Sequence, residues 1–162
     1  MPDTIPASSP ARLRNATALP TRRVLIVANQ TATSSVLIDE LRVQAGRGPV
    51  HFHLVVPALN SHLRHWLSDT DDAVLAARHR GEDALAILKS HGLPISMEVG
   101  DSVPLLAIGD ALSQFDADEI VISTLPANRS HWLEHNLVDR VCGRFDVPVR
   151  HVIAAEEVVL AA

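Results

Sequence analysis

The segment His131-Trp132-Leu133-Glu134-His135 brings together the residue types of a zinc site. It matches the pattern H-x-x-E-H, in which two histidines four positions apart on one helix bind the metal and the carboxylate acts as a base. A third ligand has to come from elsewhere, and little chain remains to supply it beyond Glu156 and Glu157. Trp132 and Leu133 fit the packing face of a helix more simply. We therefore predict no metal here and keep a metal-dependent hydrolase as the last of three alternatives.

Four further histidines fall into two pairs. His51 and His53 alternate along a predicted strand, so both should lie on one face and form a partly exposed or helix-covered polar edge. His62 and His65 are three positions apart, close enough to pair if that piece is helical. A solvated loop is the simpler interpretation of the second pair, with a lid over a binding crevice as the alternative.

No catalytic nucleophile is indicated. Serine and threonine residues occur near the ends of predicted strands, yet no G-x-S-x-G elbow surrounds them. Cys142, the only cysteine, lies late in a predicted helix, where it should pack, and it allows no intramolecular disulfide. The first predicted strand lacks the acidic cluster with which a phospho-receiver domain holds magnesium. These observations favour binding or scaffolding over catalysis, with no cofactor.

Polar residues follow the first and fourth predicted strands, where a parallel sheet usually holds phosphates. The segment from Ile122 to Leu137 contains no glycine, although glycine lets backbone N–H groups approach a phosphate closely. Arg129 and Ser130 could contact an anion, or they could be a solvated charge and a helix N-cap. The candidate ligand-binding residues are Asn29, Gln30, Thr31, Val56, Ser123, Thr124, Arg129, Ser130, His135 and Asn136.

The composition limits the number of domains, the location and the partners that we expect for this chain. A chain of 162 residues with 47% hydrophobic content suits one domain with a full core. No apolar run approaches the length of a membrane span, so we expect a cytoplasmic protein with no membrane partner. The first 23 residues carry a formal charge of +3, which leaves −8 on the rest of a chain whose total is −5. A domain this acidic is a poor nucleic-acid binder.

Strands and helices should alternate between Arg23 and Ile153, because continuous apolar runs alternate with helical spacings. Strands are predicted over Val24–Ala28, Val50–Val56, Ile95–Val99, Glu119–Ser123 and Val147–Ile153. Helices are predicted over Leu37–Gly46, Thr70–Ser90, Leu105–Leu112 and Arg129–Phe145. Asp101 or Ser102 should cap the third helix, and residues Leu59–Trp66 should form an irregular or short helical excursion after the second strand. This alternation predicts an α/β fold with an open parallel sheet and helices on both faces. Residues 1–22 should form a disordered leader and residues 154–162 a tail that could pack on a partner.

The order and spacing of several short motifs resemble the universal stress protein family. The motifs are Glu98-Val99-Gly100-Asp101 with Pro104, Ala107-Ile108, Asp118-Glu119-Ile120-Val121-Ile122 and Val147-Pro148-Val149. The resemblance implies a Rossmann-like sheet of the adenine nucleotide alpha hydrolase type, in the strand order 3-2-1-4-5. It also implies a homodimer formed through the last strand, with Val147, Val149, His151, Val152 and Ile153 at the interface.

The resemblance places a crevice between the ends of strands one and four, and this chain departs from the ATP-binding members there. Asn29 stands where those members have an aspartate, Ser123 takes the place of their first glycine, and His135-Asn136 lies near their final Gly-Ser or Gly-Thr pair. Leu125-Pro126-Ala127 fills the turn, and Pro126 removes an N–H donor outright.

These departures predict a non-catalytic homodimer with weak or no ATP binding, which acts in a stress or regulatory response by binding a small molecule or a partner. The alternative is a nucleotide-binding switch that slowly hydrolyses ATP with magnesium. It would use Asn29, Thr124, Arg129 and Ser130 in a nonstandard site.

Overall fold

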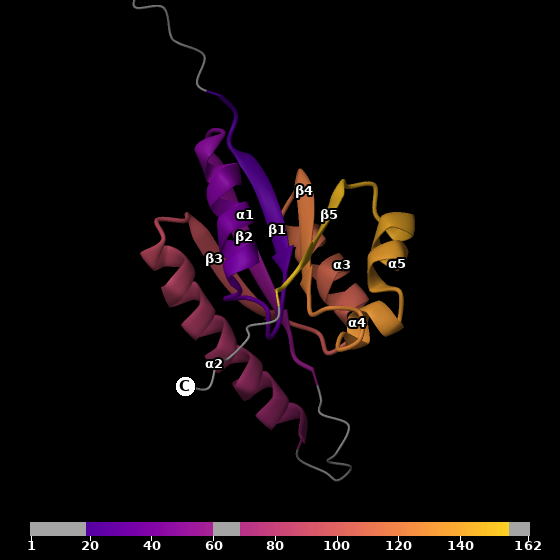
Figure 1. Cartoon of the computed structure of the whole chain (residues 1–162). Helices are drawn as coiled ribbons and strands as arrows, with labels where there is room; N and C mark the ends of the chain where they lie inside the picture. The colour runs from indigo at the N-terminus through magenta and orange to yellow at the C-terminus, as the bar shows by residue number, and fades with distance from the viewer. Residues whose placement is uncertain (1–18, 60–68, 156–162) are drawn as a thin grey trace, which may run out of the picture.

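Five parallel strands form a single sheet in the order β3-β2-β1-β4-β5, which confirms the predicted fold (Figure 1). The computed structural model describes residues 19–59 and 69–155, with the backbone alone at residues 69, 70, 133 and 134. The strands are β1 (Arg22–Val27), β2 (Val50–Pro57), β3 (Ile95–Gly100), β4 (Glu119–Thr124) and β5 (Val149–Ile153). The helices are α1 (Ser35–Gly46), α2 (Asp69–Ser90), α3 (Pro104–Gln114), α4 (His131–Glu134) and α5 (Leu137–Arg144).

Parts of three predictions lie outside the described residues: the leader up to residue 18, the excursion after β2 from residue 60, and the tail from residue 156. His62 and His65 belong to the second of these segments. Within the described ranges, no helix is both long and apolar enough to cross a membrane.

The centre of the sheet is buried on both faces, and its central strand β1 is continuously apolar from Val24 to Val27. In β1, Val24 and Ile26 pack with α1 and α2, whereas Leu25 and Val27 pack with α3 and α5. All four side chains have no exposed surface. This arrangement explains why the strand is a run of apolar residues without alternation, since a strand covered on both sides has no solvent face.

Gly100 allows α3 to lie close to the carboxyl end of β3. A Cβ atom at Gly100 would lie 2.6 Å from the Cβ of Ala107 and 2.9 Å from Cγ1 of Val55, closer than folded proteins tolerate. The predicted cap of this helix is wrong, because the N-cap residue is Val103, which makes no side-chain cap hydrogen bond. Asp101 instead accepts from the N–H of Val103 at 2.8 Å, which closes the turn before Pro104.

The predicted helix over Arg129–Phe145 is also wrong, because the chain forms two short helices with a break between them. Asn136 sits in the break with a φ of 52°, the one non-glycine residue of the described chain in the left-handed region. Asparagine tolerates this conformation better than most residues. The helical spacing of apolar residues continues across the break, so the periodicity alone does not reveal it.

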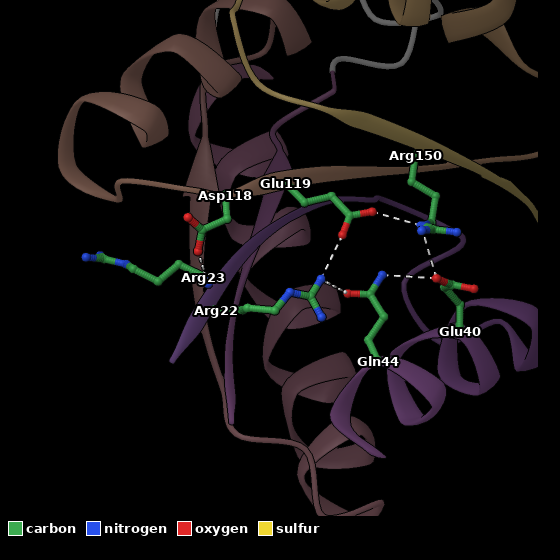
Figure 2. A network of polar contacts seen from close by, with 7 residues as sticks. All are labelled: Arg22, Arg23, Glu40, Gln44, Asp118, Glu119 and Arg150. Atoms are coloured by element: carbon green, nitrogen blue, oxygen red, sulfur yellow. Dashed lines mark hydrogen bonds and ion pairs between the residues drawn. The ribbon is translucent and has the colours of Figure 1, made fainter. Parts of the chain in front are cut away.

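The amino ends of β1, β4 and β5 are joined to α1 by a set of charged and amide side chains, which we call the amino-end network (Figure 2). Glu119 accepts from Arg22 at 3.0 Å and from Arg150 at 2.8 Å. Gln44, fully buried, accepts from Arg22 at 3.3 Å and donates to Glu40 at 3.0 Å. Arg150 also lies 3.2 Å from Glu40, so the network closes on itself.

This network stabilises the charged form of Arg150. The hydrogen bond to Glu119, followed by the negative charges of Glu40 and Glu119, raises the pKa of Arg150 above its ordinary value. Because the strand positions of Arg22, Glu119 and Arg150 are all near the amino edge of the sheet, the network links three neighbouring strands to one helix.

Candidate functional site

A pocket lies between the segment that follows β1 and the segment that follows β4. Parallel strands all end at the same edge of the sheet, and the order 3-2-1-4-5 makes the connections diverge between β1 and β4. The pocket is lined by Asn29, Gln30, Thr31, Leu59, Ser123, Thr124, Leu125, Arg129, Ser130, His131 and Trp132.

Asn29 is held in place by hydrogen bonds on both sides of its amide. Its Nδ2 donates to the carbonyl oxygen of Pro57 at 2.7 Å, and its Oδ1 accepts from the guanidinium of Arg80 in α2. Only 5% of the residue is exposed. The amide that could have met a base or a ribose is therefore already engaged by the protein.

Two hydroxyl groups of the pocket are also paired. Thr31 Oγ1 donates to the backbone carbonyl of Ser123 at 2.9 Å and so ties the segment after β1 to β4. Thr124 Oγ1 lies 2.8 Å from Nε2 of His151, which belongs to the neighbouring strand β5. Burial lowers the pKa of His151 below its ordinary value of 6.5, so the ring is neutral near pH 7.

Two polar atoms of the pocket residues lack a partner. Ser123 Oγ and Trp132 Nε1 are both buried and form no hydrogen bond within the described chain. A buried donor without an acceptor costs about 1–3 kcal/mol, and most native proteins contain few of them. The indole N–H can only donate, so the atom that would complete it is an acceptor.

The pocket is small and has a cationic residue among those that line it. Its volume is about 100 Å³. A buried water needs roughly 10–15 Å³ of such space, so the pocket takes fewer than about ten waters. Arg129 is exposed, and its backbone N–H donates to the carbonyl of Pro126 at 2.8 Å. In this form the pocket fits a small molecule or one part of a larger one.

Seven of the ten predicted binding residues line this pocket, namely Asn29, Gln30, Thr31, Ser123, Thr124, Arg129 and Ser130. The other three lie elsewhere. Val56 is fully buried in the core under α1 and α2, and His135 and Asn136 are exposed at the break between α4 and α5.

The candidate ligand-binding residues did not include five residues of the site. Leu59, Leu125, His131 and Trp132 line the pocket, and Arg80 reaches Asn29 from the middle of α2. Trp132 had a signal, since an aromatic residue so soon after a strand end can cover a crevice, although its place in the motif predicts packing alone. It does both, because it also packs against the core under α3 and α5. Arg80 had no signal, since only the packing of α2 on the sheet brings it near.

The H-x-x-E-H motif spans the short helix α4 and the residue after it, and the N–H of His135 donates to the carbonyl of His131 at 3.2 Å. Helix α4 ends at Glu134, and His135 belongs to the break before Asn136. Across residues 19–59 and 69–155, no group of three or more His, Cys, Asp or Glu side chains is placed to hold a metal ion.

No model of a known protein family matches the chain, and no curated protein matches it in sequence. Solved structures do match its fold. The universal stress protein from Archaeoglobus fulgidus in complex with dAMP has a TM-score of 0.56, is 16% identical, and the match covers 84% of this chain and 98% of that one. A universal stress family protein from Burkholderia pseudomallei has a TM-score of 0.55 and 15% identity, over 80% of this chain and 94% of that one.

A universal stress family protein from Arabidopsis thaliana with AMP bound is similar to the same degree. Its TM-score is 0.54 at 12% identity, and the match covers 85% of this chain and 94% of that one. At these identities the likeness shows the fold. The chain therefore has the α/β fold of the universal stress proteins over most of its length.

Proposed function

We propose that this protein is a non-catalytic binding protein whose pocket takes a small molecule and holds ATP weakly or not at all. The observation that carries this proposal is that residues with side chains, and no glycine, form the end of β4 and the segment that follows it, from Ser123 to Trp132. By likeness to the universal stress proteins, the proposed role is in a stress or regulatory response in the cytoplasm.

The physical reason is the loss of backbone donors. A triphosphate is usually held by several N–H groups that converge at a glycine-rich turn and a helix N-terminus. Here Pro126 has no N–H, and the N–H of Arg129 is used by the carbonyl of Pro126. The helix that follows, α4, has a single turn, so it offers little of the dipole that favours an anion.

The pocket favours a small ligand that carries an acceptor. Asn29, Thr31 and Thr124 are satisfied within the protein, and Ser123 Oγ and Trp132 Nε1 are buried donors that a ligand reaches only when neighbouring side chains move aside. An oxygen or ring nitrogen of a ligand would remove the cost of leaving them unpaired. Leu59 and Leu125 supply apolar walls for the rest of the molecule.

The test is to purify the protein without a His tag, release and identify any bound small molecule, and titrate ATP with magnesium by calorimetry. We expect no stoichiometric nucleotide and no micromolar affinity. Pro126→Gly is a matched variant, because it returns a backbone donor and should strengthen the binding of ATP if donors are what is missing. Stoichiometric bound nucleotide, or a micromolar affinity in the unaltered protein, would contradict the proposal.

A nucleotide-binding switch is the second candidate, and the exposed guanidinium of Arg129 among the pocket residues favours it. Two of the similar structures hold dAMP and AMP. On this hypothesis Arg129→Ala weakens nucleotide binding by about tenfold, since a guanidinium on a phosphate is a charge-assisted contact. Arg42→Ala, which removes another exposed arginine from α1, is the control. Equal nucleotide affinities in the two variants would show that Arg129 is a surface charge that does not contact the nucleotide.

We propose that the protein is a homodimer joined through β5, which is an edge strand of the sheet. Val147 and Val149 pack against the core under α3 and α5, Val152 packs against the opposite core, and His151 is part-buried. Ile153 is 48% exposed at this edge. An unpaired edge with an exposed apolar residue readily adds a second strand.

Light scattering tests the dimer. We expect Ile153→Lys to shift the protein to monomers at micromolar concentration. Leu106→Lys, in α3, is the control, because Leu106 has the same 48% exposure away from β5. If the unaltered protein is monomeric at high micromolar concentration, the dimer proposal is wrong.

A further inference from the structure

A second group of chemically competent side chains lies away from the pocket, on the face of β2 and β3 that α3 partly covers. We call it the Ser96 cluster, and it consists of His51 and His53 in β2, Ser96 and Glu98 in β3, and Phe115 at the end of α3. The register places His53 directly opposite Ser96. The sequence singled out the two histidines, and the proposed pocket function does not use them.

Both imidazole rings meet the same hydroxyl group. Ser96 Oγ lies 2.7 Å from Nδ1 of His53 and 3.2 Å from Nε2 of His51. The second nitrogen of His53, Nε2, lies 3.3 Å from a carboxylate oxygen of Glu98. Serine, histidine and glutamate therefore follow one another in a line.

The direction of these contacts can be derived from what each group can donate. A carboxylate only accepts, so Glu98 favours the form of His53 that carries its hydrogen on Nε2. Nδ1 of that ring is then an acceptor, and the hydroxyl of Ser96 donates to it. The hydroxyl oxygen still has free lone pairs, which accept from the N–H of His51. Each group in the line thus has one role.

Packing holds the rings in this arrangement. The ring of Phe115, 7% exposed, stacks on His53 with centroids 5.1 Å apart and meets His51 at 5.9 Å. The guanidinium of Arg23 lies 4.5 Å from the centre of the same Phe115 ring, which adds a positive charge beside the histidines. Ser96 itself is only part-buried, and a side-chain exposure of 36% at Glu98 shows that solvent reaches this face.

We infer that Ser96 is an acyl-acceptor site, a serine that His53 activates toward small acyl donors with an anionic leaving group, such as acyl phosphates. Ser96 Oγ forms a bond to the carbonyl carbon as its proton moves to Nδ1 of His53. The bond from that carbon to the leaving oxygen breaks, and the leaving group departs with the electron pair. His53 then releases the proton to solvent, and the serine carries an ester.

Each neighbour has a defined part in this step. His53 is the general base, which typically accelerates such a transfer by about 10²–10⁴-fold. Glu98 is a positioning residue that holds the ring in the right tautomer and stabilises the imidazolium as it forms. Arg23 supplies a positive charge that attracts the anionic donor. This modification of Ser96 does not depend on what the pocket after β1 and β4 binds.

The experiment uses the full chain and p-nitrophenyl acetate, which acetylates serine with release of p-nitrophenolate. The nitrophenolate released is followed by absorbance, and the acetylated residue is located by mass spectrometry of peptides. In the Cys142→Ser variant, which removes an exposed thiol that the ester would also acetylate, we expect Ser96 to be acetylated about 100-fold faster than the exposed serines Ser102 and Ser113. Acetyl phosphate should label the same residue.

Substitutions distinguish activation of Ser96 by His53 from simple exposure of the serine to solvent. Ser96→Ala should abolish the label, and His53→Gln should lower the rate of acetylation at Ser96 by about 100-fold. Glu98→Gln should lower the rate by about tenfold without a change in melting temperature, whereas Glu82→Gln, an exposed control in α2, should have no effect. Acetylation of Ser96 no faster than of Ser102, a rate that does not depend on His53, or a label on an imidazole would overturn the inference.

Discussion

The two ends of the parallel sheet differ in whether all of their polar side chains have hydrogen-bond partners. At the amino end, Arg22, Glu119 and Arg150 bond to one another and to α1, so every member of the amino-end network has a partner (Figure 2). At the carboxyl end, the buried atoms Ser123 Oγ and Trp132 Nε1 have no hydrogen-bond partner among the described residues.

This difference separates stability from binding. Paired polar groups at the amino end stabilise the sheet, and their removal leaves charges behind. Unpaired donors at the carboxyl end cost stability until something outside the chain completes them, which is the arrangement expected of a binding site. Removal of a paired group at the amino end and removal of an unpaired group at the carboxyl end should therefore change the free energy of unfolding in opposite directions.

The largest effect is expected for Glu119→Ala. The side chain of Glu119 is 13% exposed and accepts from two arginines that are 38% and 45% exposed. We expect a loss of about 2 kcal/mol in the free energy of unfolding, because hydrogen bonds to charged groups contribute about 1.5–3 kcal/mol and solvent can partly replace them here. Urea denaturation measures the loss. Asp116→Ala, at an exposed position, is the control, and an equal loss in both variants would show that the network adds nothing.

At the opposite end, Ser123→Ala should raise the free energy of unfolding by up to about 1 kcal/mol, because it removes a buried hydroxyl that has no partner. The neighbouring residue offers a matched comparison. Thr124→Val removes a hydroxyl that is paired with His151 at 2.8 Å, so it should lower the free energy of unfolding by about 1 kcal/mol. If Ser123→Ala and Thr124→Val lowered the free energy of unfolding by the same amount, Ser123 Oγ would have a hydrogen-bond partner in solution.

The smallest effect concerns pH and His151. Burial lowers its folded-state pKa below 6.5, so in the window just below pH 6.5 the unfolded chain binds a proton that the folded chain does not. Stability should therefore fall as the pH drops through this window and should be fully present above it. Chemical denaturation at pH 7.5 and 5.5 measures the change. The difference should shrink in His151→Gln, and a difference that this variant leaves unchanged must come from other groups.

The strands could be predicted because Val24–Ala28 is a continuous apolar run bounded by turns, and because Ile95, Met97 and Val99 alternate with polar residues. Their order required the family resemblance, since periodicity does not say which strands are neighbours. The break at Asn136 could not be predicted, because apolar spacing continues across it while one backbone angle changes. In the site, the residues after β1 and β4 follow from strand ends. Arg80 does not, because it reaches Asn29 only through the packing of a helix.

The pairing of Arg22 with Glu119 joins residues that are 97 positions apart. Because β1 lies at the centre of the sheet, one of its edges has no partner until β4 has left the ribosome. A nascent chain that stops short of Glu119 thus presents the apolar edge of its central strand to other chains. We expect folding to be slow relative to helical domains of this size, since its decisive contacts join the two halves of the chain.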